Sequence, residues 1–279
     1  MKRTKKALLT SIVSTFVIGN IALLPTMKAD ATAANVQNAA TSKVVFQAKD
    51  VDSYYAPAKG KTGQDLKKTL NDIIDNQTEL SYNGVWDALK KTDEDPKNPN
   101  NVILLYTGRS QSKSTNGGGP DDWNREHVWA KSHGDFGTAN GPGTDLHHLR
   151  PADVTVNSAR GNLDFDMGGK ENSEAKGNYA DGDSWEPRDA VKGDIARMIF
   201  YMAVRYEGEH GEPDLEMNEK VNNGKDPFMG KMSVLLKWNE QDPVDDNERH
   251  RNEVIYKDYQ HNRNPFIDHS EYANQIWKK

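Results

Sequence analysis

A glutamate and a histidine stand next to each other in the segment WNREHVWA, which spans residues 123–130. Glu126 offers a carboxylate, and His127 offers an imidazole with an unperturbed pKa of about 6.5, which suits proton transfer near neutral pH. Neighbouring side chains of an extended strand point to opposite faces. We therefore expect a strand to end at this pair, so that both side chains reach one site.

Further polar residues that suit acid–base chemistry or metal binding gather within residues 123–162. This stretch holds four of the eight histidines of the chain, together with Asp145, Arg150, Asp153, Asn157 and Arg160. A polar surface loop explains any single histidine, but it does not explain why four of them lie so close in sequence. Three familiar kinds of site could lie in this stretch or in the segments on either side of it: a zinc hydrolase site, a calcium-binding loop and a phosphate-binding loop.

All three kinds of site lack a required residue here. A zinc hydrolase needs H-E-x-x-H on a helix, but here the order is Glu-His, and the next histidine lies in a glycine-flanked loop at His133. A calcium-binding loop fails in DFDMGGKENSEA (164–175), which has glycine at position five and alanine at position twelve. A phosphate-binding loop fails because Ser112 stands before Lys113, where the motif needs glycine.

The set fits a nuclease that hydrolyses phosphodiesters with one metal ion. Such an enzyme needs a base for water and a cation beside the phosphate. His127 can supply a neutral imidazole, while Glu126 and the amide oxygen of Asn157 are ligands that Mg²⁺ accepts. Ca²⁺ and Mn²⁺ prefer the same oxygen ligands. Mg²⁺ keeps several waters and needs few protein groups, which leaves positions open for the phosphate.

The order of these residues resembles the endonuclease I family of secreted nucleases, which are built around a ββα-metal (His-Me) finger. The shared pieces are E-H-V, D-L-H-x-L-x-P, V-N-x-x-R-x-N and a late N-P, within about residues 100–270. The resemblance implies that His127 is the general base, that Glu126 and Asn157 are metal ligands, and that the finger lies at about 123–162. His147 matches a family histidine, for which we expect an orienting or packing role.

The segment between the two finger strands departs from the family pattern. Relatives carry cysteines and a longer segment with an arginine that contacts the scissile phosphate, whereas residues 130–144 here contain Lys131 and no arginine. The candidates for this contact are therefore Arg160, Arg150, Lys131 and Arg109.

Arg160 is one of these candidates because it follows Asn157 by three residues and so shares its helix face. A structural ion pair of Arg160 with Asp153 or Asp164 is the alternative.

Helical and extended patterns alternate along the chain, which predicts a mixed α+β, helix-rich single domain that contains the finger. We expect strands at 101–106, 124–129 and 145–151, and a short helix at 153–161 that begins at Asp153 and stops at Gly161. A polar loop is predicted at 164–186, with a hairpin that turns at Asp181–Gly182. Other helices are predicted at 64–76, 86–92, 187–207, 230–239, 245–259 and 269–277.

The first 31 residues have the pattern of a secretory signal peptide: a basic start, an apolar run and a small-x-small site at 29–31. A membrane anchor is the competing interpretation, but the N-terminal position and the cleavage site favour removal. Residues 32–42 are expected to form a flexible tether or pro-segment, and residues 43–279 are expected to form the nuclease domain. We therefore expect an extracellular monomer without membrane association after cleavage.

The charge of the chain limits how it can hold a polyanion. Cleavage takes away five basic residues and one acidic residue, so the net charge of -6 becomes -10. Any nucleic acid must therefore be held by a local basic patch or by a metal.

The proposed chemistry limits the substrate and the pH range. Hydrolysis by water requires no ribose 2′-OH, so both DNA and RNA are expected substrates, contacted through the backbone. We also expect activity to fall as the pH drops through about 6.5, the unperturbed histidine pKa. A non-enzymatic secreted protein that binds metal or nucleic acid is the alternative.

Overall fold

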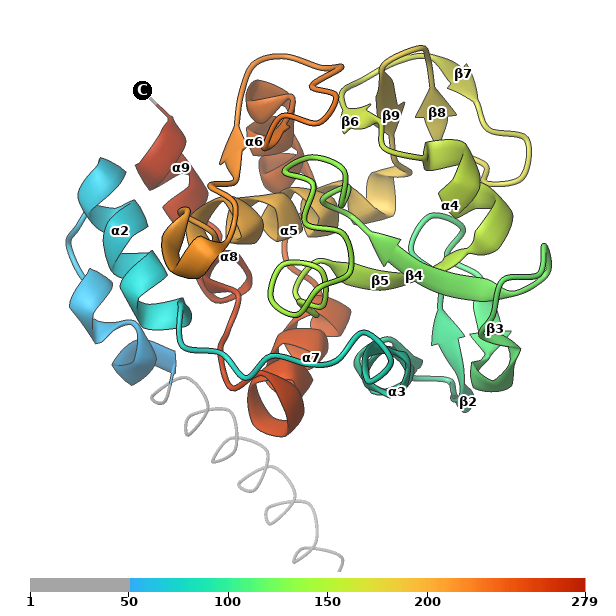
Figure 1. Cartoon of the computed structure of the whole chain (residues 1–279), viewed down its shortest axis with the longest axis horizontal. Coiled ribbons are helices and arrows are strands. Elements are labelled where there is room, and N and C mark those ends of the chain that lie inside the picture. Colours follow the sequence, from blue (N-terminus) through green and yellow to red (C-terminus); the bar gives the residue numbers. More distant parts are fainter. Residues whose placement is uncertain (1–50, 279) are drawn as a thin grey trace, which may run out of the picture. The chain divides into compact units, whose positions relative to one another are not determined.

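The computed structural model describes residues 51–278, so the predicted signal peptide and the 32–42 segment lie outside this range. The described part is α+β, as predicted, with helices and four small sheets (Figure 1). Within residues 51–278, no helix is both long and apolar enough to cross a lipid bilayer.

Helix α5 (Lys192–Arg205) forms the centre of the main hydrophobic core, and all of its residues are buried. It packs against α2 (Gly63–Ile74), α6 (Met232–Gln241) and α8 (Pro265–Asp268). Helix α9 (Tyr272–Trp277) in turn packs on α2 and α8. A helix that is buried all round needs neighbours on every side. Segments from both ends of the described chain therefore meet around α5 (Figure 1).

Strand β4 (Trp123–His127) pairs antiparallel with β5 (Leu149–Asp153), and α4 (Val154–Arg160) follows directly. The Asp153 side chain caps α4 by accepting two backbone N–H groups of its first turn. Gly161 ends the helix with φ 59°, a left-handed conformation that glycine adopts without strain. The predicted order of strand, loop, strand and helix is confirmed, and β4 ends at His127.

Strand β5 begins at residue 149, not at 145 as predicted. Residues 145–148 form a turn instead, in which the backbone N–H of His148 and that of Leu149 both donate to the Asp145 carbonyl. These two bonds replace the ladder bonds that a strand would make, so the apolar pattern alone misplaced the start of the strand.

A second, smaller hydrophobic cluster joins α3 (Val85–Thr92), β2 (Asn98–Ile103) and β4. Strand β2 lies between β1 (Glu94–Asp95) and β3 (Ser110–Ser112) and ends before residues 104–106, which the sequence placed in the strand. Those three residues are fully buried in the turn that follows β2. Burial explains their apolar character without sheet pairing.

The predicted polar loop at 164–186 contains a four-stranded sheet in the order β6-β9-β8-β7. Its strands are β6 (Asp164–Phe165), β7 (Lys170–Glu171), β8 (Tyr179–Ala180) and β9 (Ser184–Glu186). The antiparallel pairing of β8 with β9 confirms the hairpin turn at 181–182. Strands this short carry too few residues to show a clear alternation in sequence.

Most predicted helices appear with shifted ends. The helix predicted at 187–207 begins at residue 192 as α5, and the helix predicted at 269–277 begins at residue 272. The helix predicted at 245–259 is divided into two elements, and α8 was not predicted. The elements not yet given are η1 (Ala56–Ala58), η2 (Lys113–Thr115), η3 (Asp189–Val191), η4 (Glu209–Gly211), β10 (Glu216–Met217), β11 (Phe228–Met229), α7 (Asp246–Val254) and the π-helix η5 (Ile255–Tyr259).

Candidate active site

A cavity of about 310 Å³ opens where strand β4 ends. Its wall includes four residues that the sequence singled out: Glu126, His127, Lys131 and Asn157. They come from the end of β4, from the loop after it and from helix α4. The strand ends at His127, so both members of the Glu-His pair line one cavity, as expected.

The carboxylate of Glu126 is almost fully buried and is fixed through one oxygen. Its Oε1 accepts hydrogen bonds from the Tyr106 hydroxyl at 2.5 Å and from Nη1 of Arg160 at 3.2 Å. Burial raises the pKa of Glu126, while the Arg160 charge and the Tyr106 hydroxyl favour the carboxylate. Both of these side-chain bonds end on Oε1, so Oε2 is the oxygen that can serve a cation in the cavity.

The imidazole of His127 is oriented by a backbone carbonyl. Its Nε2 lies 3.1 Å from the Gly143 oxygen, and because a carbonyl only accepts, Nε2 carries the proton and Nδ1 is left as the basic nitrogen. Burial, followed by the nearby His148, lowers the pKa of His127 to about 3. The ring is therefore neutral at pH 6.5, which contradicts the expectation that its pKa is unperturbed.

Asn157 is half-buried on α4 and faces the end of β4 across the cavity wall. Its Nδ2 donates to Oδ1 of Asn124 at 2.7 Å. Because that bond uses the amide nitrogen, the amide oxygen of Asn157 is left as an acceptor. A carboxylate oxygen and an amide oxygen on one wall form the donor set that a hard divalent cation accepts.

Arg160 does not reach the surface of the cavity. Its side chain is fully buried, with Nη1 2.9 Å from the His127 carbonyl and Nη2 2.8 Å from the Val128 carbonyl. This placement does not fit a direct contact with substrate phosphate. The ion pair that Arg160 makes is with Glu126, not with Asp153 or Asp164. Arg160 thus holds the backbone and the carboxylate at the end of β4.

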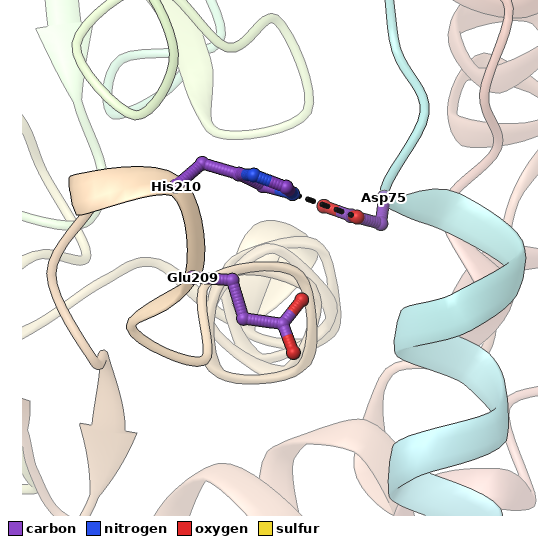
Figure 2. Close-up of side chains that lie close together, drawn as sticks. All are labelled: Asp75, Glu209 and His210. Carbon is purple, nitrogen blue, oxygen red and sulfur yellow. Dashed lines mark ion pairs between the residues drawn. The ribbon is translucent and has the colours of Figure 1, made fainter.

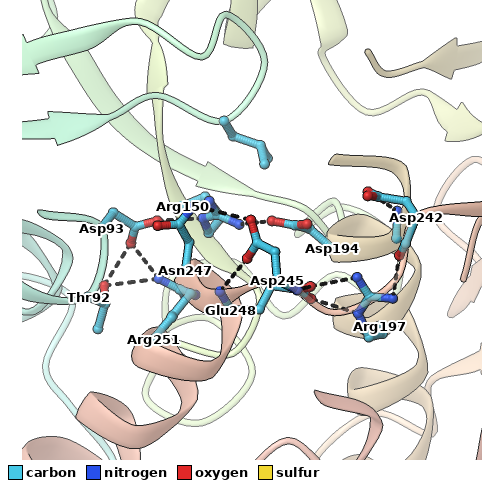
Figure 3. Close-up of polar contacts among 12 residues, drawn as sticks. Thr92, Asp93, Arg150, Asp194, Arg197, Asp242, Asp245, Asn247, Glu248 and Arg251 are labelled. Atoms are coloured by element: carbon cyan, nitrogen blue, oxygen red, sulfur yellow. Dashed lines mark hydrogen bonds and ion pairs between the residues drawn. The ribbon is translucent and has the colours of Figure 1, made fainter. Parts of the chain in front are cut away.

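Arg150 and Arg109 also lie away from the cavity at β4. Arg150 is buried and pairs with Asp93 at 2.6 Å and with Asp194 at 3.2 Å, beside a separate cavity of about 500 Å³. Figure 3 shows this network, in which Arg251 shares Asp93 with Arg150. Arg109 is about half exposed and pairs with Asp153. These ion pairs do not fit the predicted phosphate contacts.

His147 occupies a packing position and does not line the cavity. Its Nε2 lies 3.2 Å from Oδ1 of Asn262, and its ring centroid lies 4.4 Å from that of Tyr201. The neighbouring Asp145 accepts hydrogen bonds from Tyr201 and from Gln260. The D-L-H segment (residues 145–147) and the segment just before the late N-P pair (residues 264–265) therefore meet in one buried polar network.

The sequence analysis gave no role to several wall residues, namely Tyr82, Asn124, Arg125, Ser132 and Asn162, although Asn162 ends the V-N-x-x-R-x-N motif. Strand alternation was a usable signal for Arg125, because it stands two residues before His127 and so shares its face. Tyr82 lies far from the finger in sequence, and nothing in its local pattern singles it out.

One group of three metal-capable side chains occurs among the described residues. Figure 2 shows Asp75, Glu209 and His210, whose ligand atoms all lie within 4.8 Å of one another. Asp75 already pairs with Arg205 at 2.9 Å, and both Glu209 and His210 are exposed. None of the three lines the cavity at β4.

Strands β4 and β5 and helix α4 thus bring a histidine, a carboxylate and an amide oxygen to the wall of one cavity. The chain belongs to the endonuclease I family, whose sequence profile matches residues 62–271. It is 72% identical over 228 residues to an extracellular ribonuclease of Bacillus subtilis (strain 168), covering 82% of this chain and 79% of the relative. It is 69% identical over 237 residues to an extracellular ribonuclease of Bacillus amyloliquefaciens, covering 85% and 82%.

Proposed function

We propose that this chain is a secreted, metal-dependent endonuclease that hydrolyses phosphodiester bonds in RNA and DNA with little sequence specificity. The observation that carries the proposal is the shared cavity of Glu126, His127 and Asn157 at the end of β4. The names of the two Bacillus relatives support RNA as a substrate and an extracellular location.

In this proposal His127 is the general base. Its Nδ1 takes the proton of the attacking water, while the Nε2–H bond to the Gly143 carbonyl keeps the ring in place. The buried, neutral ring needs no loss of a proton before it can act. This carbonyl has the same orienting function that a carboxylate has in other histidine-dependent hydrolases.

Glu126 and Asn157 are the residues that would hold a divalent cation, because each has an oxygen left over on the cavity wall. Mg²⁺ is the cation we favour, and Ca²⁺ or Mn²⁺ would take the same oxygens. A bound cation would supply charge stabilisation to the phosphoryl group and to the leaving oxygen. The Arg160 guanidinium favours the charged form of the Glu126 carboxylate, against the effect of burial, and holds it in position.

Substrate contact in this proposal is made through the backbone. Lys131 is exposed on the cavity wall and is the one predicted phosphate-binding residue that lies there. No group of the proposed mechanism contacts a ribose 2′-OH, which supports activity on DNA as well as RNA.

A gel assay tests the proposal. The chain from residue 32 to 279 would be incubated with plasmid DNA and with total RNA, each with Mg²⁺ and with EDTA, as wild type, as His127→Ala and as His250→Ala. His250 is an exposed histidine on α7 and serves as the matched control. Loss of a general base costs about a hundredfold in rate or more, so we expect cleavage to need metal and His127 but not His250.

Each pattern of cleavage has a definite meaning. Degradation of RNA alone would still support the proposed site but would restrict the substrate to RNA. Full activity of His127→Ala would remove His127 as the base. Intact polymers under all conditions would favour the alternative, a non-enzymatic protein that binds metal or nucleic acid.

A further inference from the structure

Arg125 is a cation on the cavity wall that lacks a carboxylate partner. Across residues 51–278, Arg125 and Arg188 are the two arginines with no carboxylate oxygen within 4.0 Å, and only Arg125 lines the cavity at β4. A half-buried guanidinium loses part of its hydration, which is unfavourable unless an anion replaces it. Burial accordingly lowers the pKa of Arg125.

The guanidinium is held in place although it has no ion pair. Its central carbon lies 3.5 Å from the ring centroid of Tyr82 and 4.0 Å from that of Trp86, and Nη1 donates to the Tyr82 carbonyl at 2.5 Å. Contacts of this kind fix an arginine over aromatic rings and leave part of its guanidinium edge free to donate. Nε is buried without a hydrogen-bond partner among the described residues, so the outer nitrogens are the ones that can meet a ligand.

The position of Arg125 relates it directly to the proposed base. Arg125 and His127 are two residues apart on β4 and therefore share a face of the strand. The Tyr82 ring that lies against Arg125 also stacks on the His127 ring, with centroids 6.0 Å apart. The aromatic ring thus fixes the guanidinium and the imidazole relative to each other.

The remaining wall of the cavity favours an anion. Lys131 is exposed there with no carboxylate within ion-pair distance in the described range, and the buried Oγ of Ser132 has no hydrogen-bond partner. Glu126 is the one carboxylate among the lining residues, and it already pairs with Arg160. The wall therefore carries two cationic side chains, Arg125 and Lys131, that no carboxylate of the wall neutralises.

We propose that Arg125, held by Tyr82 and Trp86, binds a backbone phosphate of the nucleic acid beside His127, with Lys131 as a second phosphate contact. This inference rests on the proposed nuclease function and names the group that holds the substrate. A guanidinium can donate two parallel hydrogen bonds to phosphate oxygens. Arg125 thereby fills the role for which Arg160, Arg150 and Arg109 are wrongly placed.

The first test measures binding without cleavage. A fluorescein-labelled single-stranded oligonucleotide is titrated with protein in EDTA, and the dissociation constant is followed by anisotropy over a range of KCl concentrations. Each lost phosphate contact lowers the slope of log affinity against log salt by about 0.7 for single strands. We expect Arg125→Met to lower the slope by that amount and Arg188→Met to leave it unchanged. Arg188 is the matched control because it lacks a carboxylate partner and lies outside the cavity.

The second test measures cleavage with metal. Charge-assisted hydrogen bonds of this kind correspond to about tenfold to a hundredfold in kcat/KM, so we expect a loss in that range for Arg125→Met. Arg125→Lys should recover part of it, since lysine keeps the charge but not the planar fork. The metal concentration for half-maximal activity should stay unchanged, which separates Arg125 from the metal ligands.

The outcomes separate the inference from the proposed function. An unchanged salt slope with unchanged kcat/KM for Arg125→Met would overturn the inference while wild-type cleavage still supports the nuclease. If the wild-type protein binds the oligonucleotide with a salt slope that depends on Arg125 but does not cleave nucleic acid, the inference is supported and the proposed nuclease function is overturned. If both Arg125→Met and Arg125→Gln fail to fold, as judged by circular dichroism and thermal melting, Arg125 is a structural residue and the inference is overturned.

Discussion

Arg160→Met is the substitution whose effect the structure defines most sharply. It removes the cation that pairs with the buried Glu126 carboxylate, and it leaves the carbonyls of His127 and Val128 without their donor. Breaking one side of a buried ion pair costs about 3–5 kcal/mol. Each unsatisfied carbonyl adds about 1 kcal/mol. We expect the free energy of unfolding to fall by about 4 kcal/mol or more. The loss is smaller than the sum of these costs because Glu126 can take up a proton once Arg160 is gone.

The assay is urea unfolding followed by tryptophan fluorescence at pH 7.5, in EDTA so that metal binding does not add stability. The double variant Arg160→Met with Glu126→Gln tests the reasoning, because glutamine removes the uncompensated charge. We expect the double variant to be about 2 kcal/mol more stable than Arg160→Met alone, a coupling typical of directly contacting residues.

Two results would refute this assignment of Arg160. A loss below about 1 kcal/mol for Arg160→Met would be that of an ordinary surface substitution. A double variant no more stable than the single one would show that Arg160 is not the counter-ion of Glu126. Either result would reopen a direct phosphate contact for Arg160.

Three further perturbations follow from the same geometry. Burial lowers the pKa of His147 and of His148 to about 4. The unfolded chain, with pKa near about 6.5, therefore binds more protons than the folded one between pH 6.5 and 4. Stability should fall as the pH drops through that window, by about 2 kcal/mol per histidine at pH 5, and a urea midpoint constant to pH 4.5 would contradict this. Asn157→Ala should raise the Mg²⁺ concentration for half-maximal cleavage severalfold with little change in melting temperature, and an unchanged metal titration would remove it as a ligand. Asp153→Ala should cost about 1 kcal/mol because α4 loses its cap, whereas Asp153→Asn should retain most of that, as urea unfolding of both variants would show.

The local identity of the site could be predicted from the sequence. Glu126 and His127 are adjacent, Asn157 and Arg160 stand three residues apart, and Asp153 and Gly161 mark the ends of one short helix. Such signals act over a few residues, through capping bonds and helical spacing, so a single segment contains all the information needed. The ββα unit appears where this pattern placed it.

The role of each cation was decided by tertiary structure alone. Arg160 carries the right charge at the right spacing for a phosphate contact, but its helix packs so that the guanidinium points into the protein and bonds to the end of β4. The sequence analysis gave Arg125 no role. In the folded chain the rings of Tyr82 and Trp86 lie against its guanidinium and hold it in place on the cavity wall. No local pattern encodes which side of a strand the rest of the chain will cover.

What the sequence by itself determined, then, is the inventory of reactive groups and the segment that carries them. What only the tertiary structure decided is which groups are paired and which are left over. Tyr82 meets His127 across 45 positions of sequence, and Asn262 meets His147 across 115. Burial and ion pairing depend on such distant neighbours, so the free oxygen of Glu126 and the unpaired guanidinium of Arg125 become visible only in the folded chain.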